Sequence, residues 1–280
     1  MTKSSPLITF TTGNQAPQLG FGVWQIPNDK TAAAVQTALD AGYRLIDTAT
    51  IYENEDGVGQ GLKASGLPRH DYFISTKVWN DSHGFDATKA AFYQSLERLQ
   101  LDYVDMYLIH WPVPKINQYV ESWQAMIELR NEGLIKNMGV CNFNAEHIET
   151  LLNETGVSPV VNQIELHPGF QQQAMRQFNA EHGIQTQAWS PMGLGTLWDN
   201  PTLAEIAAKH QRNVGQIMLR WQIELGNMVI SKSETPERIR SNLDIFSFSL
   251  DADDLRAIAA LHSDQGRLGP DPQLFRLPKN

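Results

Sequence analysis

The chain has 280 residues, of which 41% are hydrophobic and 19% charged, a balance that excludes a disordered chain and allows a large apolar core. Its net charge of −9 argues against nucleic acid or an anionic membrane surface as a partner. The one cysteine, Cys141, excludes an internal disulfide and disfavours a zinc cluster, and no apolar run suits a signal peptide or a membrane span, so we expect a soluble, cytoplasmic protein.

Short apolar segments alternate along the chain with longer amphipathic ones. The short segments predict strands at 19–23, 43–47, 72–77, 103–109, 135–140, 160–164, 184–189 and 228–230. Most of these segments begin roughly 25–30 residues apart, which is the length of a strand–helix unit. Helical periodicity occupies the intervals, for example from Asp29 to Gly42, from Ala87 to Leu99 and from Tyr119 to Arg130. This alternation indicates a parallel sheet covered by helices on both faces.

Two folds fit the alternation: an open doubly wound sheet and a closed (β/α)8 barrel. The count of eight strands favours the barrel. No Gly-x-Gly-x-x-Gly opens a helix after the first strand, and the closest approach, GVGQG at 57–61, is predicted inside a helix. We therefore predict a single (β/α)8 TIM-barrel domain over residues 1–280 with short loops at its mouth. Residues 7–19, with a turn at Gly13, predict an N-terminal β-hairpin that plugs the barrel bottom.

Ionisable residues end three successive predicted strands. Asp47, Lys77 and His110 occupy these ends, and Tyr52 follows Asp47 on a turn. The carboxyl ends of barrel strands converge on one mouth, so the four side chains are expected to be neighbours. An ammonium near a phenol lowers the pKa of the phenol, and a carboxylate compensates the buried ammonium. With an imidazole to orient a carbonyl oxygen, such a group can protonate an alkoxide as it forms.

Each of these residues also has a structural interpretation. Asp47 and Lys77 could form a simple salt bridge, Tyr52 could be a half-buried aromatic, and His110 could be a core histidine. Any one of them alone favours the structural interpretation. All four at neighbouring strand ends favour the functional one.

Several segments resemble the signatures of the aldo-keto reductases. Residues 42–55 (GYRLIDTATIYENE) resemble the first signature, and 108–112 (LIHWP), 139–143 (GVCNF) and 162–165 (NQIE) resemble later ones. The resemblance runs almost from end to end and implies a (β/α)8 barrel that binds NADPH and reduces aldehydes or ketones. It further implies that Tyr52 is the general acid, that Lys77 and Asp47 tune it, and that His110 positions the carbonyl.

Within that family the chain is most similar to the bacterial subgroup that includes 2,5-diketo-D-gluconate reductases. This resemblance implies a small-molecule carbonyl substrate, such as methylglyoxal, a keto sugar or a keto acid like 2,5-diketo-D-gluconate. It also implies a monomer, because the family is often monomeric.

A nicotinamide is required because none of these side chains can supply a hydride. Asn142 and Gln163 end adjacent strands and suit its carboxamide, while Trp189 could stack on its ring. The small-residue loop that contains Ser190 and Gly193 could let the backbone approach the pyrophosphate. The structural alternatives are satisfied buried amides, a core tryptophan and a plain turn. By the resemblance, Cys141 replaces a serine at the cofactor, so one cofactor contact is expected to be softened.

A phosphate site is predicted after the last strand. Lys232, Ser233 and Arg238 surround a helix start that has Thr235 as its predicted N-cap. Two cations with hydroxyls suit a 2′-phosphate and favour NADPH over NADH, although a solvated charged helix start is the alternative. By the resemblance, Lys232, Ser233 and Arg238 hold the 2′-phosphate and Asn242 contacts the adenine.

Aromatic residues beside strand ends are the candidate lining of the substrate pocket. Trp24, Trp79 and Trp111 are the strongest, Phe275 is a weaker candidate, and Asn80 could bond substrate oxygens. All of them could instead be structural.

Two other classes of function compete with the reductase. One is a catalytically weak NADPH-binding redox sensor or interaction subunit with the same fold, which the intact set of four ionisable residues disfavours. The other is a metal-dependent barrel enzyme, but the Glu165-x-His167 spacing has no third ligand, so we expect no metal site.

Overall fold

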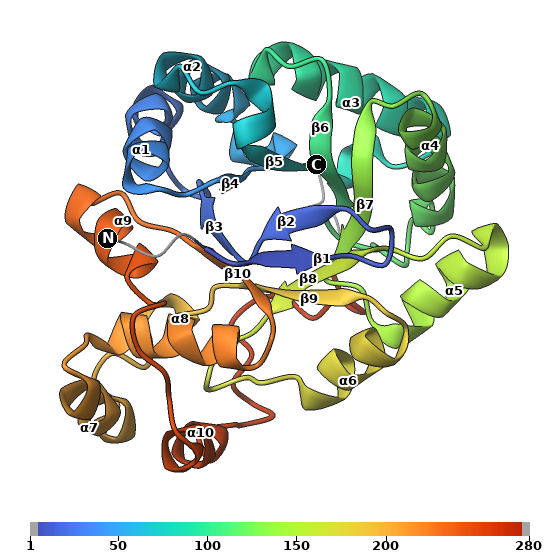
Figure 1. Ribbon diagram of the computed structural model, residues 1–280. Coiled ribbons are helices and arrows are strands. Elements are labelled where there is room, and N and C mark those ends of the chain that lie inside the picture. The colour runs from blue at the N-terminus through green and yellow to red at the C-terminus, as the bar shows by residue number, and fades with distance from the viewer. Residues whose placement is uncertain (1–4, 276–280) are drawn as a thin grey trace.

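The computed structural model describes residues 5–275 and shows a closed barrel of parallel strands (Figure 1). In barrel order the strands are β3 (Leu19–Gly22), β4 (Leu45–Asp47), β5 (Phe73–Val78), β6 (Val104–Ile109), β7 (Ile135–Cys141), β8 (Val161–Glu165), β9 (Gln185–Trp189) and β10 (Met228–Ser231). Pairing of β10 with both β9 and β3 closes the ring. The predicted (β/α)8 barrel is confirmed, and every predicted strand overlaps an observed one.

Helices surround the barrel, and their buried apolar residues join those of the strands in one core (Figure 1). They are α1 (Asn28–Ala41), α2 (Glu55–Ser65), α3 (Phe85–Leu99), α4 (Tyr119–Asn131), α5 (Ala145–Thr155), α6 (Gln173–Glu181), α7 (Pro201–His210), α8 (Val214–Glu224), α9 (Pro236–Leu243) and α10 (Ala252–Ala259). Among residues 5–275, no helix combines the length and apolar character needed to cross a bilayer.

The glycines of residues 57–61 lie inside α2, as predicted, and serve helix packing. A Cβ atom at Gly59 would stand 2.6 Å from the carbonyl oxygen of Leu99, at the end of α3. Only glycine allows the two helices to approach so closely. The GVGQG run is therefore a packing feature.

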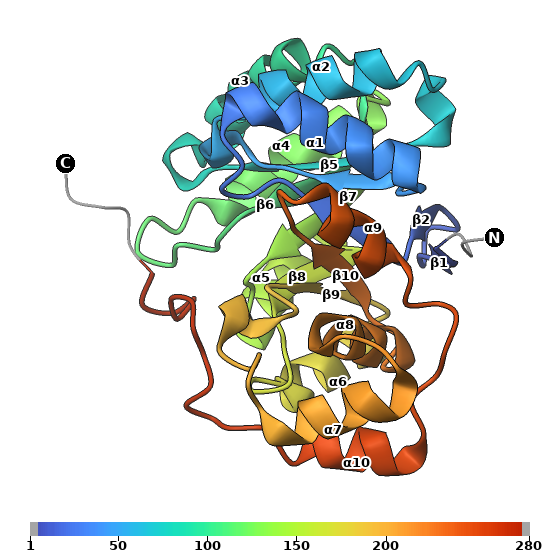
Figure 2. The ribbon, with the colours of Figure 1, turned by 90° about the vertical axis from the view of Figure 1, so that its left-hand side faces the viewer.

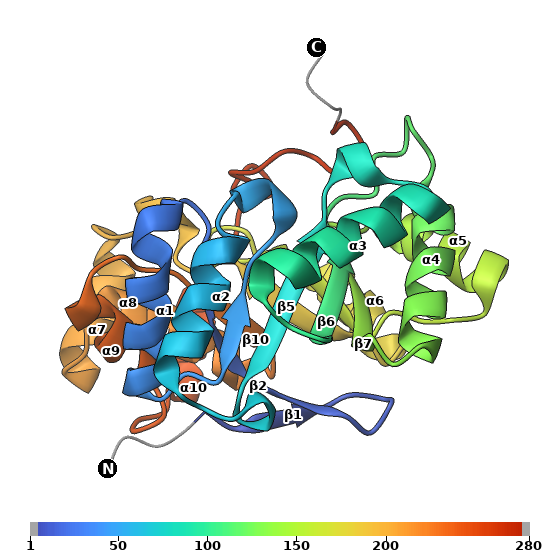
Figure 3. The ribbon, with the colours of Figure 1, turned by 90° about the horizontal axis from the view of Figure 1, so that it is seen from above.

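The N-terminal hairpin closes the bottom of the barrel. Its strands β1 (Leu7–Thr9) and β2 (Gln15–Pro17) are antiparallel, and Gly13 adopts a φ of 85° in the turn between them. Phe10 and Ala16 pack against the lower barrel interior. Figures 2 and 3 show the hairpin at one end of the barrel and the chain that follows α10 at the other. The mouth opposite the hairpin is thus where the carboxyl ends of the strands meet.

Candidate active site

A cavity of about 780 Å³ opens at the barrel mouth. Thirteen of the residues predicted from the sequence line it: Trp24, Asp47, Tyr52, Trp79, His110, Trp111, Cys141, Asn142, Gln163, Trp189, Ser190, Lys232 and Phe275. All but Phe275 come from the ends of most of the barrel strands and from the loops that follow. The topology therefore gathers most of the predicted catalytic, cofactor and substrate residues around one space.

Lys77 and Asp47 form a buried ion pair beneath the cavity. The Lys77 Nζ lies 2.6 Å from Asp47 Oδ2 and donates to the Thr48 carbonyl at 2.8 Å. Burial lowers the pKa of Lys77, but Asp47 raises it, and the net pKa lies above the ordinary value. The ammonium is therefore charged at neutral pH.

Tyr52 lines the cavity beside this ion pair, on the short 3₁₀ helix η1 (Thr50–Tyr52). The Lys77 Nζ lies 5.2 Å from the centre of its ring. Burial raises the pKa of Tyr52, and the Lys77 charge lowers it by a smaller amount, so the net pKa is raised. The ammonium lowers this pKa, as the sequence predicts, but desolvation of the phenol outweighs that effect. Tyr52 therefore keeps its proton at neutral pH.

His110 packs edge-on against two aromatic rings of the site. Its ring centre lies 5.7 Å from that of Tyr52 and 5.1 Å from that of Trp79. Burial, and then the Lys77 charge, hold the pKa of His110 well below its ordinary value. The imidazole is neutral at physiological pH, which leaves it one N–H donor.

These four side chains can perform proton donation to an oxygen. The phenol of Tyr52 holds the proton, the fixed Lys77 cation favours the phenolate left behind, and His110 offers a second polar contact. Asp47 keeps the cation in place. Such preorganised groups stabilise negative charge that develops on a reacting oxygen.

Two amides and an indole that line the cavity form a second network of hydrogen bonds. Asn142 accepts a hydrogen bond from Trp189 Nε1 at 2.8 Å and donates to the His110 carbonyl at 3.1 Å. Gln163 donates to Asp47 Oδ1 at 3.2 Å and to Gln187 Oε1 at 2.8 Å. The network links the proposed nicotinamide seat directly to the Asp47 carboxylate.

Cys141 is a buried thiol within this network. Its sulfur accepts from Asn142 Nδ2 at 3.1 Å and lies 3.5 Å from Gln163 Oε1. Burial raises the pKa of the thiol. A raised pKa leaves no thiolate at neutral pH, so this position offers no nucleophile.

The loop after β9 has a backbone suited to a close ligand approach. Ser190, Gly193, Leu194 and Gly195 all have positive φ, from 47° to 90°. Ser190 and Gly195 line the cavity, whereas Gly193 does not.

The predicted phosphate residues surround the start of α9 at the edge of the cavity. Lys232 lines the cavity and pairs with Glu234 at 2.9 Å, while Arg238 is exposed. Thr235 occupies the N-cap position without a side-chain cap bond, and its N–H donates instead to Ser233 Oγ at 3.1 Å. Ser233, Thr235, Arg238 and Asn242 lie outside the cavity wall. Amides, an aromatic ring, a glycine loop and cations in this order fit the chemical groups of a nicotinamide dinucleotide.

Asn80 is the predicted substrate residue that the structure does not bring to the cavity. It is 1% exposed on the turn that follows Trp79, and neither of its amide atoms has a hydrogen-bond partner in the described part of the chain. Trp79, the residue before it, lines the cavity, whereas the turn directs the Asn80 side chain into the protein interior. It therefore has no direct route to a substrate oxygen.

Sequence reasoning predicted Phe275 at the cavity, where it lies, but missed the other residues that the segment after α10 contributes. Leu268, Gly269 and Pro270 line the cavity, and Phe275 stacks on Trp111 with ring centres 4.3 Å apart. Phe275 had an aromatic signal in the sequence, but the other three carry no motif. Trp198, from the loop after β9, also lines the cavity without a prior signal.

Three comparisons place these features among known proteins. The sequence model of the Aldo/keto reductase family matches residues 16–263. An aldo-keto reductase of Mycolicibacterium smegmatis is 51% identical over 97% of this chain and 98% of its own length. Methylglyoxal reductase DkgA of Escherichia coli is also 51% identical, over 96% of this chain and 98% of its own. The crystal structure of a Gox0644 mutant in complex with NADPH superposes with a TM-score of 0.95 at 45% identity and covers 98% of this chain and all of the other.

Proposed function

The chain belongs to the aldo/keto reductase family, and from that membership we propose that it reduces small aldehydes and ketones to alcohols with NADPH. The observation that supports this proposal best is the site itself. A protonated Tyr52, a charged Lys77 and a neutral His110 gather at one cavity of about 780 Å³. The NADPH-bound Gox0644 structure supports the choice of cofactor.

Each residue of the cluster receives a role in this proposal. Tyr52 donates its proton to the carbonyl oxygen as negative charge develops there. Lys77 stabilises the phenolate left on Tyr52, and Asp47 holds Lys77 in place. His110 donates a hydrogen bond that orients the carbonyl oxygen. With these roles the proton donor and its partners are already in position before the reaction begins, so the side chains need not move as charge develops.

The proposed cofactor seat follows the order of polar groups along the cavity. Bound NADPH supplies the hydride that no side chain can supply. Asn142 and Gln163 would bond the carboxamide, Trp189 would cover the ring, and the Ser190 loop would hold the pyrophosphate. Farther along, Lys232, Ser233, Thr235 and Arg238 would hold the 2′-phosphate, with Asn242 near the adenine.

The proposed substrates are small carbonyl compounds. Methylglyoxal is supported by relatives named methylglyoxal reductase at about half identity, and 2,5-diketo-D-gluconate by the sequence resemblance. The test is oxidation of NADPH with each compound and with a wider carbonyl panel. NADPH binding without turnover would favour a redox sensor or interaction subunit, and absence of binding would refute the cofactor assignment.

We also propose that the protein acts as a monomer in the cytoplasm. Most of the exposed large apolar side chains of the described residues belong to the cavity rim rather than to a separate patch: Trp24, Ile51, Leu194, Trp198 and Leu268. A separate apolar patch of some hundred Å² would be the usual mark of a partner surface. The single cysteine, buried Cys141, suits a reducing compartment.

The rate of reduction is expected to change little between pH 5.5 and 9, roughly. Tyr52 keeps its proton because its pKa lies above the ordinary value of a phenol, and His110 stays neutral because its pKa lies well below that of free imidazole. The kcat/KM profile reports both groups in the free enzyme. A fall in kcat/KM as the pH rises from 7 to about 8.5 would mean that Lys77, not burial, sets the acidity of Tyr52.

Substitution of Lys232 by alanine is expected to weaken NADPH binding about 10- to 100-fold, because a charge-assisted contact to phosphate is lost. NADH lacks the 2′-phosphate, so its dissociation constant should change less than about twofold. Fluorescence titration of each nucleotide measures both values. Lys209→Ala is the matched control, because Lys209 pairs with Asp251 and Asp254 away from the cavity. Equal weakening of NADH and NADPH would refute the phosphate role of Lys232.

A further inference from the structure

The chain after α10 returns to the barrel mouth and forms part of the cavity wall. We call residues Gly266–Pro270 the strap. Figure 3 shows the chain after α10 running along the end of the barrel opposite the hairpin. Leu268, Gly269 and Pro270 line the cavity, although this segment has no helix or strand to hold its shape. Its position must therefore be fixed by contacts with the barrel.

The buried carboxylate of Glu165, the last residue of β8, holds the strap. Its Oε1 accepts the Leu268 N–H at 2.6 Å, and its Oε2 accepts the Gly269 N–H at 2.8 Å. Glu165 is 1% exposed, and its only side-chain hydrogen-bond partner among residues 5–275 is His167, whose Nε2 lies 3.1 Å from Oε1. Burying a carboxylate without a lysine or arginine is costly unless hydrogen bonds compensate it. Here two strap amides and His167 supply that compensation.

The strap also packs at close range against the barrel. The Ser263 N–H donates to the Gly169 carbonyl at 3.0 Å, and a Cβ at Gly266 would overlap that same oxygen. Gly266 thus lets the two backbones touch. This contact with the loop after β8 is a second tether, and along the chain it comes just before the amides that Glu165 binds.

The strap touches Trp189, the residue proposed to cover the nicotinamide. A Cβ at Gly269 would lie 2.6 Å from Trp189 Cη2, so only glycine fits between the indole and the carboxylate. On its other edge the indole donates to Asn142 at 2.8 Å. Trp189 is therefore held between the strap and the Asn142 network. The position of the strap thus determines how far the indole ring can move.

From these contacts we propose that Glu165 is a positioning residue of the reductase, which anchors the strap so that Leu268–Pro270 complete the cavity wall and hold Trp189 in place. This inference rests on the proposed function, since it assigns the anchor to the same site. A carboxylate suits the task because both of its oxygens accept hydrogen bonds, so one side chain fixes two successive amides. A neutral amide of the same shape would present an NH₂ group to one of these N–H donors.

The test is the Glu165→Gln variant, which keeps the side-chain volume. Hydrogen exchange of the cofactor-free protein reports the anchor directly, and the amides of Leu268 and Gly269 are expected to exchange at least about tenfold faster. In steady-state assays, the KM for the carbonyl substrate and the dissociation constant of NADPH are expected to rise about 3- to 10-fold. kcat should stay within about twofold, because Glu165 touches none of the reacting groups.

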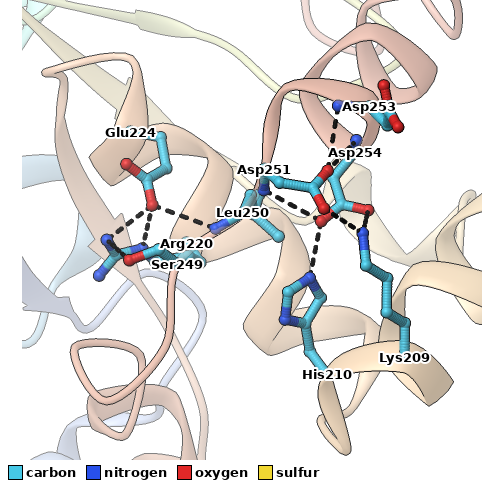
Figure 4. A network of polar contacts seen from close by, with 9 residues as sticks. All are labelled: Lys209, His210, Arg220, Glu224, Ser249, Leu250, Asp251, Asp253 and Asp254. Atoms are coloured by element: carbon cyan, nitrogen blue, oxygen red, sulfur yellow. Dashed lines mark hydrogen bonds and ion pairs between the residues drawn. The ribbon is translucent and has the colours of Figure 1, made fainter.

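Two further variants separate the anchor from general destabilisation. Gly269→Ala keeps the Glu165 carboxylate but places a methyl against both that carboxylate and Trp189, which displaces the strap. It is therefore expected to reproduce the rise in KM, and it tests the strap even where Glu165→Gln fails to fold. Asp254→Asn is the matched control. Asp254 is a buried carboxylate that accepts the Asp251 N–H at 3.1 Å and pairs with Lys209 and His210 (Figure 4), yet it touches no strap residue. Its KM and NADPH affinity are expected to match the wild type.

Each other result would overturn the inference. Unchanged exchange at Leu268 and Gly269 in Glu165→Gln would show that the carboxylate does not hold the strap. Faster exchange with unchanged KM and NADPH affinity would show that the strap does not shape the site. The same rise in KM in Asp254→Asn would mean that the rise in Glu165→Gln comes from a general loss of stability. A wild-type protein without turnover would instead refute the proposed function, while exchange and NADPH binding would still report on the anchor.

Discussion

Replacement of Tyr52 by phenylalanine is expected to lower kcat by about 10²- to 10⁴-fold, the usual contribution of a positioned general acid. The substitution removes only the hydroxyl, so the ring contact with His110 and the shape of the cavity remain. Lys77 then has no phenolate to stabilise. The dissociation constant of NADPH should stay within about twofold, because the proposed cofactor contacts lie on other residues.

Single-turnover kinetics with methylglyoxal, together with NADPH titration, measure both quantities. Tyr93→Phe is the matched control, since it removes a phenol hydroxyl from the surface, where Tyr93 is 46% exposed. Its kcat is expected to equal that of the wild type. Retention of more than about a tenth of the activity by Tyr52→Phe would exclude Tyr52 as the proton donor.

Replacement of Lys77 by methionine is expected to destabilise the fold by about 3–5 kcal/mol and to abolish most of the activity. The methionine fills a similar volume, but Asp47, 4% exposed, is left as a buried charge without its cation. Within the part of the chain that the structure describes, only the Gln163 amide, 3.2 Å from Asp47 Oδ1, remains as a side-chain partner. Activity falls because no cation stabilises the Tyr52 phenolate.

Urea denaturation of three variants separates these effects. Asp47→Asn combined with Lys77→Met removes both charges, so it should recover most of the lost stability but none of the lost activity. Asp47→Asn alone should also lose stability, because it leaves the ammonium unpaired. A loss below about 1 kcal/mol in Lys77→Met would show that the Asp47 charge is compensated without Lys77.

The strand order and the hairpin could be predicted from the sequence because they follow local patterns. Apolar runs of strand length at regular spacing translate directly into a barrel, and the turn at Gly13 into a hairpin. The gathering of Asp47, Lys77 and His110 was predictable for the same reason. Parallel strands place their carboxyl ends together, so position in the sequence implies position in space.

The acidity of Tyr52 could not be predicted in the same way. The sequence shows the ammonium that lowers its pKa, but desolvation depends on every group packed around the phenol. The position of Asn80 could not be predicted either. Asn80 directly follows Trp79, yet the turn directs its side chain into the protein interior and not into the cavity. Direction on a turn is set by backbone geometry that residue type does not encode.

The sequence by itself determined the barrel, its family and the chemistry available at its mouth, because regular periodicity and strand-end residues report local and topological order. Tertiary structure alone decided how that mouth is closed. Glu165 and His167 are two residues apart and have the spacing of a metal pair, yet in the fold they bond each other. Glu165 also accepts the N–H groups of Leu268 and Gly269, which lie 103 and 104 residues farther along the chain. Contacts between a carboxylate and distant backbone amides involve no side-chain pattern in the strap, so only the folded chain reveals them.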